Sequence, residues 1–244
     1  MKIISLVMPV YNGEKILPTT FQLLTNFFSN RPYLSEVLFV NDGSIDATKQ
    51  LLEDFKKQNP FTVKIINQKK NSGKGAAVRL GITNVQSASD YIFFCDDDIP
   101  FGFEPLEAMY RVLESDAAVG LVTADRTLTR QNNPYPWHRR VGSFCYGLLM
   151  PQAIARDFPD MHGGLKGFHR QTADLIFSLI KNPRWSFDPE IFLIAKANNI
   201  KVVKVAVHFL AHVAGTHFKI KDFISVANEI IRLRFNYILG RYRL

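Results

Sequence analysis

The chain has 244 residues, of which 47% are hydrophobic and 21% charged, a composition that predicts one large or two small globular domains with a real core. Its two cysteines exclude a disulfide framework, and no apolar run is long enough to span a bilayer. No N-terminal signal peptide is visible, so we expect a cytoplasmic location. The formal net charge of +8 favours anionic partners, namely phosphates, nucleic acid or a membrane surface.

The first half of the chain alternates β-prone and helical patterns. Strands are expected at Ile3–Val10, Glu36–Val40, Val63–Asn67 and Tyr91–Cys95, and helices at about Glu14–Ser29, Asp46–Gln58 and Gly75–Val85. Strands separated by helices of this length predict right-handed βαβ units and a mainly parallel sheet. In such a sheet, ligands bind at the carboxyl ends of the strands.

The second half is expected to contain further strands and helices around a long loop. Its strands are predicted at Val119–Ala124 and Val202–Phe209, and its helices at Ser143–Ala155, Thr172–Lys181, Phe187–Asn199 and Ile220–Leu239. The stretch Arg126–Arg140 lacks periodicity and contains Asn-Asn-Pro-Tyr-Pro, so it indicates a loop. A loop of this length in a compact domain is often a lid or a binding loop.

Three consecutive aspartates, Asp96, Asp97 and Asp98, follow the apolar strand Tyr91–Cys95 directly. Repulsion between these charges is costly unless a cation lies among them, although a solvated turn is the simpler interpretation of the tripeptide alone. Asp96 and Asp98 have the right chemistry to hold Mg²⁺ or Mn²⁺ against a diphosphate. Asp97 would be a spacer that points the other way if the strand geometry continues.

Polar loops follow the other strands of the first half. In Asn41–Ser44, either Asp42 accepts an N–H of uracil or guanine or the segment is only a tight turn before a helix, and Tyr11 is suited to stack on a base. The glycine-rich segment Asn71–Ala77 lacks the first glycine of the Walker pattern and has Gly75 where Ser or Thr would hold magnesium. Its glycines, the charge of Lys74 and the following helix N-terminus suit a nucleotide diphosphate.

The order of these motifs resembles the inverting family 2 glycosyltransferases, whose GT-A fold binds a nucleotide sugar. Two later segments, Asp160–Phe168 and Arg184–Glu190, are similar to motifs of the dolichyl-phosphate glucosyltransferases, and the resemblance runs from Ile3 to about Arg234. It departs from the family where His162 replaces a glutamine, and in the segments around Lys204 and Gly215. These departures all lie between residues 99 and 218, the part of the chain that the resemblance assigns to the acceptor.

The resemblance implies an α/β protein of the GT-A fold, with a Rossmann-like, mainly parallel central sheet flanked by helices. It implies a glycosyltransferase domain at residues 1–218, divided into a nucleotide-sugar-binding half (1–98) and an acceptor half (99–218). A basic amphipathic helix would occupy residues 219–244. This helix would lie on an anionic membrane surface, dock on the core by its apolar face, or do both.

The resemblance further implies a metal-dependent hexosyltransferase that moves glucose from UDP-glucose to a polyprenyl phosphate. Mg²⁺ or Mn²⁺ would be held by Asp96 and Asp98. The residues expected to be catalytic are Asp98, Arg126, Arg139 and Asp188. Those expected to bind substrate are Pro9, Tyr11, Glu14, Asp42, Gly43, Lys74, Asp96, Arg140, Ser143, Lys166 and Glu190. The alternatives are GDP-mannose as the donor, or a sugar hydroxyl of a surface polysaccharide as the acceptor.

The class of acceptor decides whether a general base is needed. A phosphate monoester has a second pKa of about 6 and is a nucleophilic dianion at neutral pH, so it needs only positioning by groups such as Arg126, Arg139, Arg140 and Ser143. A solvated basic loop is the alternative for Arg139 and Arg140. A hydroxyl acceptor would require a base, for which Asp188 or Glu190 is the candidate, unless Asp188 only caps its helix.

Other partners are less well supported by the sequence. A non-catalytic module that binds nucleic acid would fit the basic charge, but no aromatic-basic motif supports it, and we expect no nucleic-acid partner. The spacing of His208, His212 and His217 fits no zinc pattern. A lipid acceptor would be met at the interface, so the enzyme is expected to be peripheral on the cytoplasmic face of a membrane.

Overall fold

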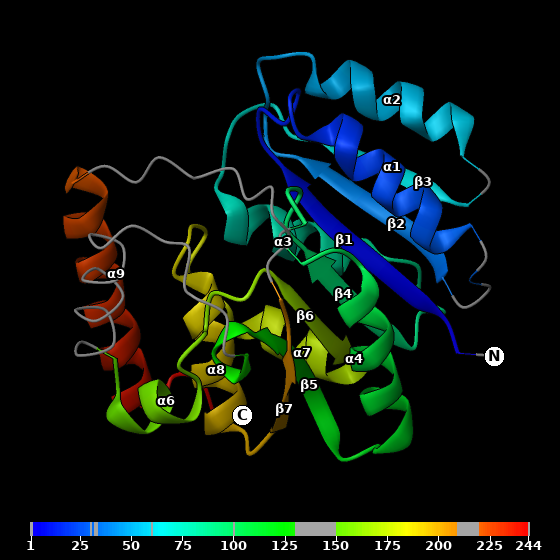
Figure 1. Cartoon of the computed structure of the whole chain (residues 1–244). Coiled ribbons are helices and arrows are strands. Elements are labelled where there is room, and N and C mark those ends of the chain that lie inside the picture. The colour runs from blue at the N-terminus through cyan, green and yellow to red at the C-terminus, as the bar shows by residue number, and fades with distance from the viewer. Residues whose placement is uncertain are drawn as a thin grey trace.

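A seven-stranded sheet forms the middle layer of the protein (Figure 1). The computed structural model describes residues 2–29, 31, 34–59, 61–99, 101–129, 150–208 and 220–243. Within these residues the strands are β1 (Ile4–Val10), β2 (Leu34–Asn41), β3 (Val63–Asn67), β4 (Tyr91–Cys95), β5 (Val119–Asp125), β6 (Leu165–His169) and β7 (Lys201–Ala206). Their order across the sheet is β3-β2-β1-β4-β6-β5-β7.

Helices cover both faces of this sheet. They are α1 (Leu17–Phe28), α2 (Thr48–Gln58), α3 (Lys74–Thr83), α4 (Glu104–Ser115), α6 (Gln152–Asp157), α7 (Arg170–Leu179), α8 (Phe187–Ala197) and α9 (Ile220–Ile238), with a short 3₁₀ turn, η1, at Arg126–Leu128. One core joins α1, α2 and α4 to the sheet, and the other joins α3, α7 and α8 to its opposite face. The protein is therefore a three-layer α/β/α structure.

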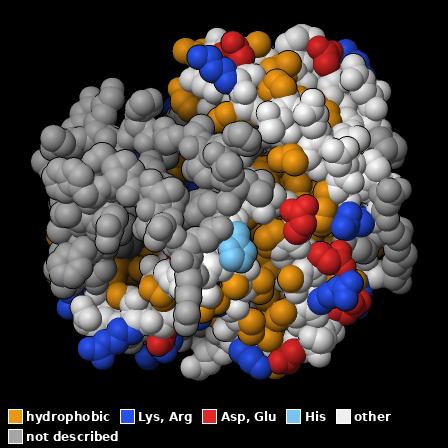
Figure 2. All heavy atoms as spheres, in the orientation of Figure 1, with side chains coloured by type: hydrophobic (Ala, Val, Ile, Leu, Met, Phe, Trp, Pro, Cys, Tyr) orange, Lys and Arg blue, Asp and Glu red, His pale blue; other side chains and the backbone are white. Residues whose placement is uncertain are grey.

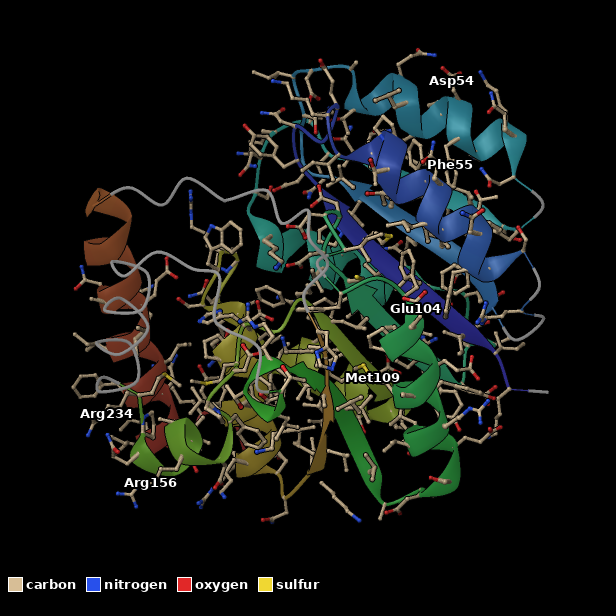
Figure 3. The ribbon with its side chains drawn as sticks, viewed as in Figure 1. Asp54, Phe55, Glu104, Met109, Arg156 and Arg234 are labelled. Atoms are coloured by element: carbon tan, nitrogen blue, oxygen red, sulfur yellow. The ribbon has the colours of Figure 1, made fainter. Side chains whose placement is uncertain are left out.

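The strands of the first half are buried because they lie between these two helical layers. Successive residues of β1 enter opposite cores, with Leu6 and Met8 in the first and Val7 in the second. This arrangement explains why all seven residues of β1 are buried and why β1 shows no alternation of polar and apolar residues. On α2, Phe55 points toward the sheet and Asp54 points outward (Figure 3).

Most of the sheet is parallel, as the βαβ pattern predicts. β1 pairs in parallel with β2 and β4, β2 with β3, and β5 with β7. The exception is β6, which is antiparallel to both of its neighbours, β4 and β5. Neither strand β6 nor helix α4 is predicted from the sequence, and in β6 the reason is that Lys166 and Gly167 are poor strand formers.

The remaining boundaries differ from the predictions by small amounts. β3 and β4 have the predicted bounds, whereas α1 begins at Leu17 rather than Glu14, and β7 ends at Ala206 rather than Phe209. The first turn of α1 starts late because residues 14–16 form a turn that is bonded back to Gly13. The predicted helix Ser143–Ala155 and the loop Arg126–Arg140 lie partly outside the described residues, and α6 begins at Gln152.

The sheet is continuous across the boundary that separates the two expected halves of the domain. β4 belongs to residues 1–98 and pairs with β6, which belongs to residues 99–218. The C-terminal helix α9 packs on α8 and buries Ile230 and Leu233 in the second core. In the part of the chain that the structure describes, no helix combines the length and the apolar character that crossing a membrane requires. Around α4, acidic and basic side chains are interspersed at the surface (Figure 2).

The position of β6 depends on the absence of a side chain at Gly167. Gly167 is paired with Phe93 of β4, and a Cβ at Gly167 would lie 2.2 Å from the Phe93 ring. We expect Gly167→Ala to destabilise the protein by about 1–3 kcal/mol, because the ring is fully buried and cannot move aside. Urea unfolding monitored by circular dichroism measures this loss.

The double variant Gly167→Ala/Phe93→Leu tests the cause. Leucine lacks the ring atoms that the new methyl group would meet, so the two losses should sum to more than the loss of the double variant. Strict additivity of the two losses would show that crowding against Phe93 is not the reason.

Candidate active site

The polar ends of β1 and β2 are joined by hydrogen bonds between their loops. Asn12, which has a positive φ of 52°, receives at Oδ1 the backbone N–H of Ile45 (3.0 Å), and its own N–H donates to Ser44 Oγ (2.9 Å). Glu14 Oε2 accepts the N–H of Ala47 at 3.1 Å. Tyr11 is 47% exposed beside this junction, whereas Pro9 is buried within β1 opposite Val40. Tyr11 is therefore open to a ligand, and Pro9 is part of the strand.

Asp42 lies at the end of β2 and organises the glycine-rich loop. Its Oδ1 accepts hydrogen bonds from Gln68 Nε2 (2.9 Å) and the backbone N–H of Ser72 (2.8 Å), and its Oδ2 accepts the N–H of Gly73 (2.9 Å). The adjacent Gly43 has a φ of 71°, and a Cβ there would lie 2.4 Å from the backbone of Lys70. Asp42 and Gly43 thus hold residues 70–73 in place, and a contact between Asp42 and a nucleotide base stays a prediction.

The glycine-rich loop packs closely on the segment before α8. A Cβ on Gly73, whose φ is 101°, would lie 2.5 Å from Pro183 O, and one on Gly75 would lie 2.7 Å from Asn182 O. The N–H of Ala76 donates to Pro183 O at 2.9 Å. The two glycines are required because the backbones approach too closely for any side chain. Lys74 is consequently carried toward α8 at the start of α3.

Four charged side chains of alternating sign form a chain at the centre of the site, two of them buried and two partly exposed. Lys74 Nζ lies 2.6 Å from Asp96 Oδ1 and 3.9 Å from Asp188 Oδ2. Lys166 Nζ donates to Asp188 Oδ1 and to Gly163 O, both at 2.7 Å. Lys166 and Asp188 are almost completely buried, with exposed side-chain fractions of 0% and 2%. We call Asp96, Lys74, Asp188 and Lys166 the charge chain.

Lys74 stays protonated at the junction of this chain. Burial alone would lower the pKa of Lys74, but the negative charges of Asp96 and Asp188 outweigh burial and raise it above its ordinary value. The ammonium group also lies 5.2 Å from the centre of the half-exposed Trp185 ring, within cation–π range. Lys74 is thus a fixed positive charge next to the three aspartates.

The three aspartates do not share one direction. Asp96 Oδ2 lies near Gly164, where an added Cβ would be 2.6 Å away, whereas Asp97 Oδ2 lies near Gly13, at 3.4 Å from such a Cβ. Asp98 Oδ1 is buried and accepts no hydrogen bond from a described residue. Burial and the neighbouring carboxylates raise the pKa of Asp97 to about 7 and that of Asp98 to about 6.

These observations fit a divalent cation bound by Asp96 and Asp98. An unsatisfied buried carboxylate oxygen and a raised pKa both indicate that the negative charge lacks a counter-charge. Among the described residues, no group of three or more His, Cys, Asp or Glu side chains is arranged to hold a metal ion. Mg²⁺ is commonly bound by one or two carboxylates plus substrate phosphates, so two protein ligands suffice if a diphosphate supplies others.

On the other side of the charge chain, Arg126 is tied to Asp160. The backbone N–H of Arg126 donates to Asp160 Oδ2 at 2.8 Å, its Nε donates to the same oxygen at 2.7 Å, and its NH2 group pairs with Oδ1. Burial would raise the pKa of Asp160, but these contacts with Arg126 outweigh burial and lower it. Arg126 is therefore held rigidly at the end of β5.

Glu190 has a complete set of structural partners. Its Oε1 accepts the Tyr242 hydroxyl at 2.7 Å and the N–H of Lys181 at 3.1 Å, and its Oε2 accepts the N–H of Asn182 at 2.8 Å. Burial raises the pKa of Glu190, and these hydrogen bonds oppose the shift. Glu190 thus connects the C-terminal residues to the segment that packs on the glycine-rich loop.

Several of the predicted site residues converge and others do not. The structure brings Lys74, Asp96, Lys166 and Asp188 into contact and places Asp98 directly after them, but Arg139, Arg140 and Ser143 lie outside the described residues. The predicted cap role of Asp188 is not observed, because α8 has Ser186 as its N-cap without a side-chain bond. Sequence reasoning assigned no role to Gln68, Asp160 or Tyr242, whose partners are distant in the chain.

Comparison with known proteins identifies similar chains. A family model described as glycosyl transferase family 2 matches residues 5–177. The dolichyl-phosphate beta-glucosyltransferase ALG5A of Trichomonas vaginalis is 27% identical over 99% of this chain and 76% of its own length. The Homo sapiens dolichyl-phosphate beta-glucosyltransferase is 26% identical over 100% of this chain and 78% of its own length.

The fold also matches a solved structure. The glucosyl-3-phosphoglycerate synthase of Mycobacterium tuberculosis, in complex with Mn²⁺, UDP-glucose and phosphoglyceric acid, superposes with a TM-score of 0.69 at 16% identity. The match covers 99% of this chain and 80% of the synthase. Another structure of that synthase holds Mg²⁺ and UDP. At this identity the likeness establishes the GT-A fold, which confirms the fold class expected from the sequence.

Breaking the buried end of the charge chain should be costly for stability. In Lys166→Met, Asp188 keeps its charge but loses its 2.7 Å partner in the interior. We expect the free energy of unfolding to fall by about 3–5 kcal/mol, because an uncompensated buried charge remains. Chemical denaturation measures the change.

Lys196→Met is the matched control. Lys196 pairs with Asp157 at the same 2.7 Å, but both side chains are 45% exposed. This variant should lose less than about 1 kcal/mol, because surface ion pairs contribute little. In Lys166→Met/Asp188→Leu, removing both charges should recover part of the loss. Equal losses for Lys166→Met and Lys196→Met would contradict the assigned role of the buried pair.

Proposed function

This chain belongs to glycosyl transferase family 2, and from that premise we propose that it transfers glucose from UDP-glucose to a polyprenyl phosphate. The relatives named dolichyl-phosphate beta-glucosyltransferase, which match nearly the whole chain, support this donor and acceptor. The synthase structure that holds UDP-glucose and a phosphorylated acceptor supports the same pairing of substrates.

The donor would lie along the carboxyl ends of β1, β2 and β4. We propose that the base lies against Tyr11 and the loop held by Asp42, with Glu14 bracing the junction between the two loops. Lys74 supplies positive charge beside the diphosphate. A divalent cation held by Asp96 and Asp98 would neutralise the charge that develops on the leaving diphosphate.

The observation that carries the choice of acceptor is that both candidate bases are engaged elsewhere. Asp188 Oδ1 accepts a hydrogen bond from the ammonium group of Lys166, and its Oδ2 forms an ion pair with Lys74 at 3.9 Å. Both oxygens of Glu190 accept hydrogen bonds from structural partners. A carboxylate in either environment is poorly placed to take a proton from a sugar hydroxyl. A phosphate acceptor needs no such base, since it is already ionised at neutral pH.

In the proposed reaction no proton is transferred to the protein. An oxygen of the acceptor phosphate attacks the anomeric carbon of glucose and forms the new bond. The bond between that carbon and the β-phosphate oxygen breaks, and UDP leaves with the electron pair. Attack from the face opposite UDP inverts the anomeric centre. The task of the residues is therefore to position two phosphorylated substrates and to compensate their charge.

Basic residues near β5 would bind the acceptor phosphate. Arg126 is held beside the charge chain by Asp160, and its guanidinium would contribute positive charge on the acceptor side of the site. Arg139, Arg140 and Ser143 are proposed to add further donors. Because the polyprenyl chain is insoluble, the reaction is proposed to take place at the cytoplasmic face of a membrane, with the protein bound peripherally.

Removing a metal ligand should abolish cation binding without harming the fold. Asp98 has a raised pKa and an unsatisfied oxygen, so its replacement in Asp98→Ala removes repulsion and should not lower the melting temperature. With UDP present, Mn²⁺ should raise the melting temperature of the wild type, and Asp98→Ala should weaken Mn²⁺ binding at least about 10-fold. The matched control Asp54→Ala, an exposed carboxylate on α2, should bind Mn²⁺ normally.

The same binding should depend on pH in a defined direction. Without metal, the folded-state pKa of Asp98 is about 6, above its unfolded value, so its ionisation destabilises the fold as pH rises through this range. Mn²⁺ binds the ionised form, and its stabilising effect should therefore be large at pH 7.5 and fade below about pH 6. An Mn²⁺ effect that is unchanged at pH 5, or is kept in Asp98→Ala, would refute the metal assignment.

The proposed activity is tested by supplying labelled sugar nucleotides and Mn²⁺ with each class of acceptor. We expect UDP-glucose and a polyprenyl phosphate to give a glucosylated lipid phosphate, and GDP-mannose to give little product. A soluble glycan that offers only hydroxyl groups should not be glucosylated. Transfer to the glycan, with no lipid-linked product from any donor, would support the polysaccharide alternative instead.

A further inference from the structure

Helix α9 has an exposed apolar face as well as a buried one. Ile230 and Leu233 are buried against the core, where they contribute to the cluster that contains α8. Four large apolar side chains on α9 and the residue that follows it remain open to solvent: Ile231 (42% exposed), Phe235 (60%), Ile238 (66%) and Leu239 (61%). We call these four residues the α9 stripe.

Helix geometry places the α9 stripe opposite the buried face. Each residue turns the helix by about 100°, so steps of four, three and one along the stripe keep its side chains on one side. Burial of Ile230 and Leu233 therefore explains the docking of α9 on the core but not the stripe. An apolar row of this kind on the surface marks an interaction site, whereas single exposed apolar residues are ordinary.

Basic side chains border the α9 stripe on both sides. By the same geometry, Arg232 lies at one edge of the stripe and Arg234 at the other, and both are exposed. Figure 3 shows Arg234 on the side of α9 that faces away from the sheet. Arg241 and Arg243 follow in the next turn, and the sequence from Ile230 to Arg243 contains no acidic residue. The stripe is therefore an apolar row with a basic residue at each edge.

We propose that the α9 stripe inserts into the headgroup region of an anionic lipid bilayer, with the bordering arginines on lipid phosphates. An apolar row flanked by cations fits a surface that is apolar inside and negative outside, and arginine can lay its stem along the apolar region while its head reaches the phosphates. A protein partner would need an apolar groove with acidic rims on both sides. This inference rests on the proposed lipid-linked acceptor, which the bilayer would present.

The docking helix is connected to the active site by a continuous set of hydrogen bonds. Tyr242, just after α9, donates to Glu190, and Glu229 of α9 accepts from Asn182 Nδ2 at 3.1 Å. The backbone N–H groups of Lys181 and Asn182 donate to Glu190, and Pro183 next to them accepts the N–H of Ala76 in the first turn of α3. A bilayer bound at the α9 stripe would therefore hold the site in a fixed orientation to the lipid surface.

Vesicle flotation tests the apolar part of the surface. Wild-type protein should float with equimolar phosphatidylcholine and phosphatidylglycerol vesicles and only weakly with phosphatidylcholine alone. Phe235→Ser/Ile238→Ser should weaken binding to the mixed vesicles about 10-fold or more, because less apolar area is inserted. Ile45→Ser removes a side chain that is 89% exposed elsewhere on the protein and should bind like the wild type.

A second pair of variants tests the charges with little risk to folding. Arg232→Gln/Arg234→Gln should weaken binding about 10-fold or more at low salt, because each basic residue near an anionic surface contributes to binding. Lys49→Gln/Lys56→Gln removes the same charge from exposed positions of α2 and should have little effect. Equal loss from both pairs would show that net charge, rather than the α9 surface, controls binding, and would overturn the proposal.

An activity assay separates this inference from the proposed function. With a short isoprenyl phosphate that stays in solution, the α9 variants should match the wild type, and with polyprenyl phosphate in vesicles they should lose activity in proportion to binding. Wild-type transfer to the soluble acceptor without vesicle binding would overturn the lipid surface and leave the function standing. Vesicle binding through α9 without transfer to any prenyl phosphate would support the lipid surface and overturn the proposed function.

A dimer in solution that Phe235→Ser abolishes, with no vesicle binding, would assign the stripe to a second copy of the chain and also overturn the proposal.

Discussion

The site depends on a partly buried chain of alternating charges at the carboxyl edge of the sheet. Asp96 directly follows β4, and Lys74, Asp188 and Lys166 belong to α3, α8 and β6, so their contacts fix the relation between four elements. Each buried charge is tolerable only because an opposite charge lies beside it. Lys74 offsets the charges of Asp97 and Asp98 only in part, because burial and the neighbouring carboxylates still raise the pKa of both, so excess negative charge remains where a cation would bind.

The same chain explains how one site handles two anionic substrates. Lys74 lies between Asp96 and Asp188, so in the proposed arrangement the donor diphosphate and the acceptor would share one ammonium group. The positive charge of Lys166, which is buried and inaccessible to solvent, compensates the negative charge of Asp188. Carboxylates held in this way serve to position lysines, and an acceptor that is already ionised suits such a site.

The sequence allowed the donor half to be predicted well because its signals are local. β3 and β4 have the predicted bounds, and the motifs after β1, β2 and β4 lie at the same edge of the sheet, as expected for parallel strands. The family resemblance placed Lys166 and Asp188 in the site without indicating that they pair. The spacing of these two residues along the chain carries no signal for that contact.

The parts that sequence reasoning missed depend on contacts between distant segments. β6 contains Lys166 and Gly167, which are poor strand formers, and it is held as a strand by β4 on one side and β5 on the other. The hydrogen bonds of Asp42 to Gln68, Ser72 and Gly73 were not predicted, whereas its contact with a base stays a prediction. For the C-terminal helix the sequence left open docking on the core, binding to a membrane, or both, and the structure shows the docking, through Ile230 and Leu233.

The central claim, that the transfer needs no general base from the protein, is tested most directly by the pH dependence of kcat at saturating Mn²⁺. With a prenyl phosphate acceptor, the rate should rise as the acceptor ionises at a pH of about 6 and stay level above it. Replacing the acceptor by a phosphonate analogue, which has a higher second pKa, should shift the rise upward by the same amount. A rise that stays at one pH for both acceptors would assign the ionisation to a protein side chain and contradict the account.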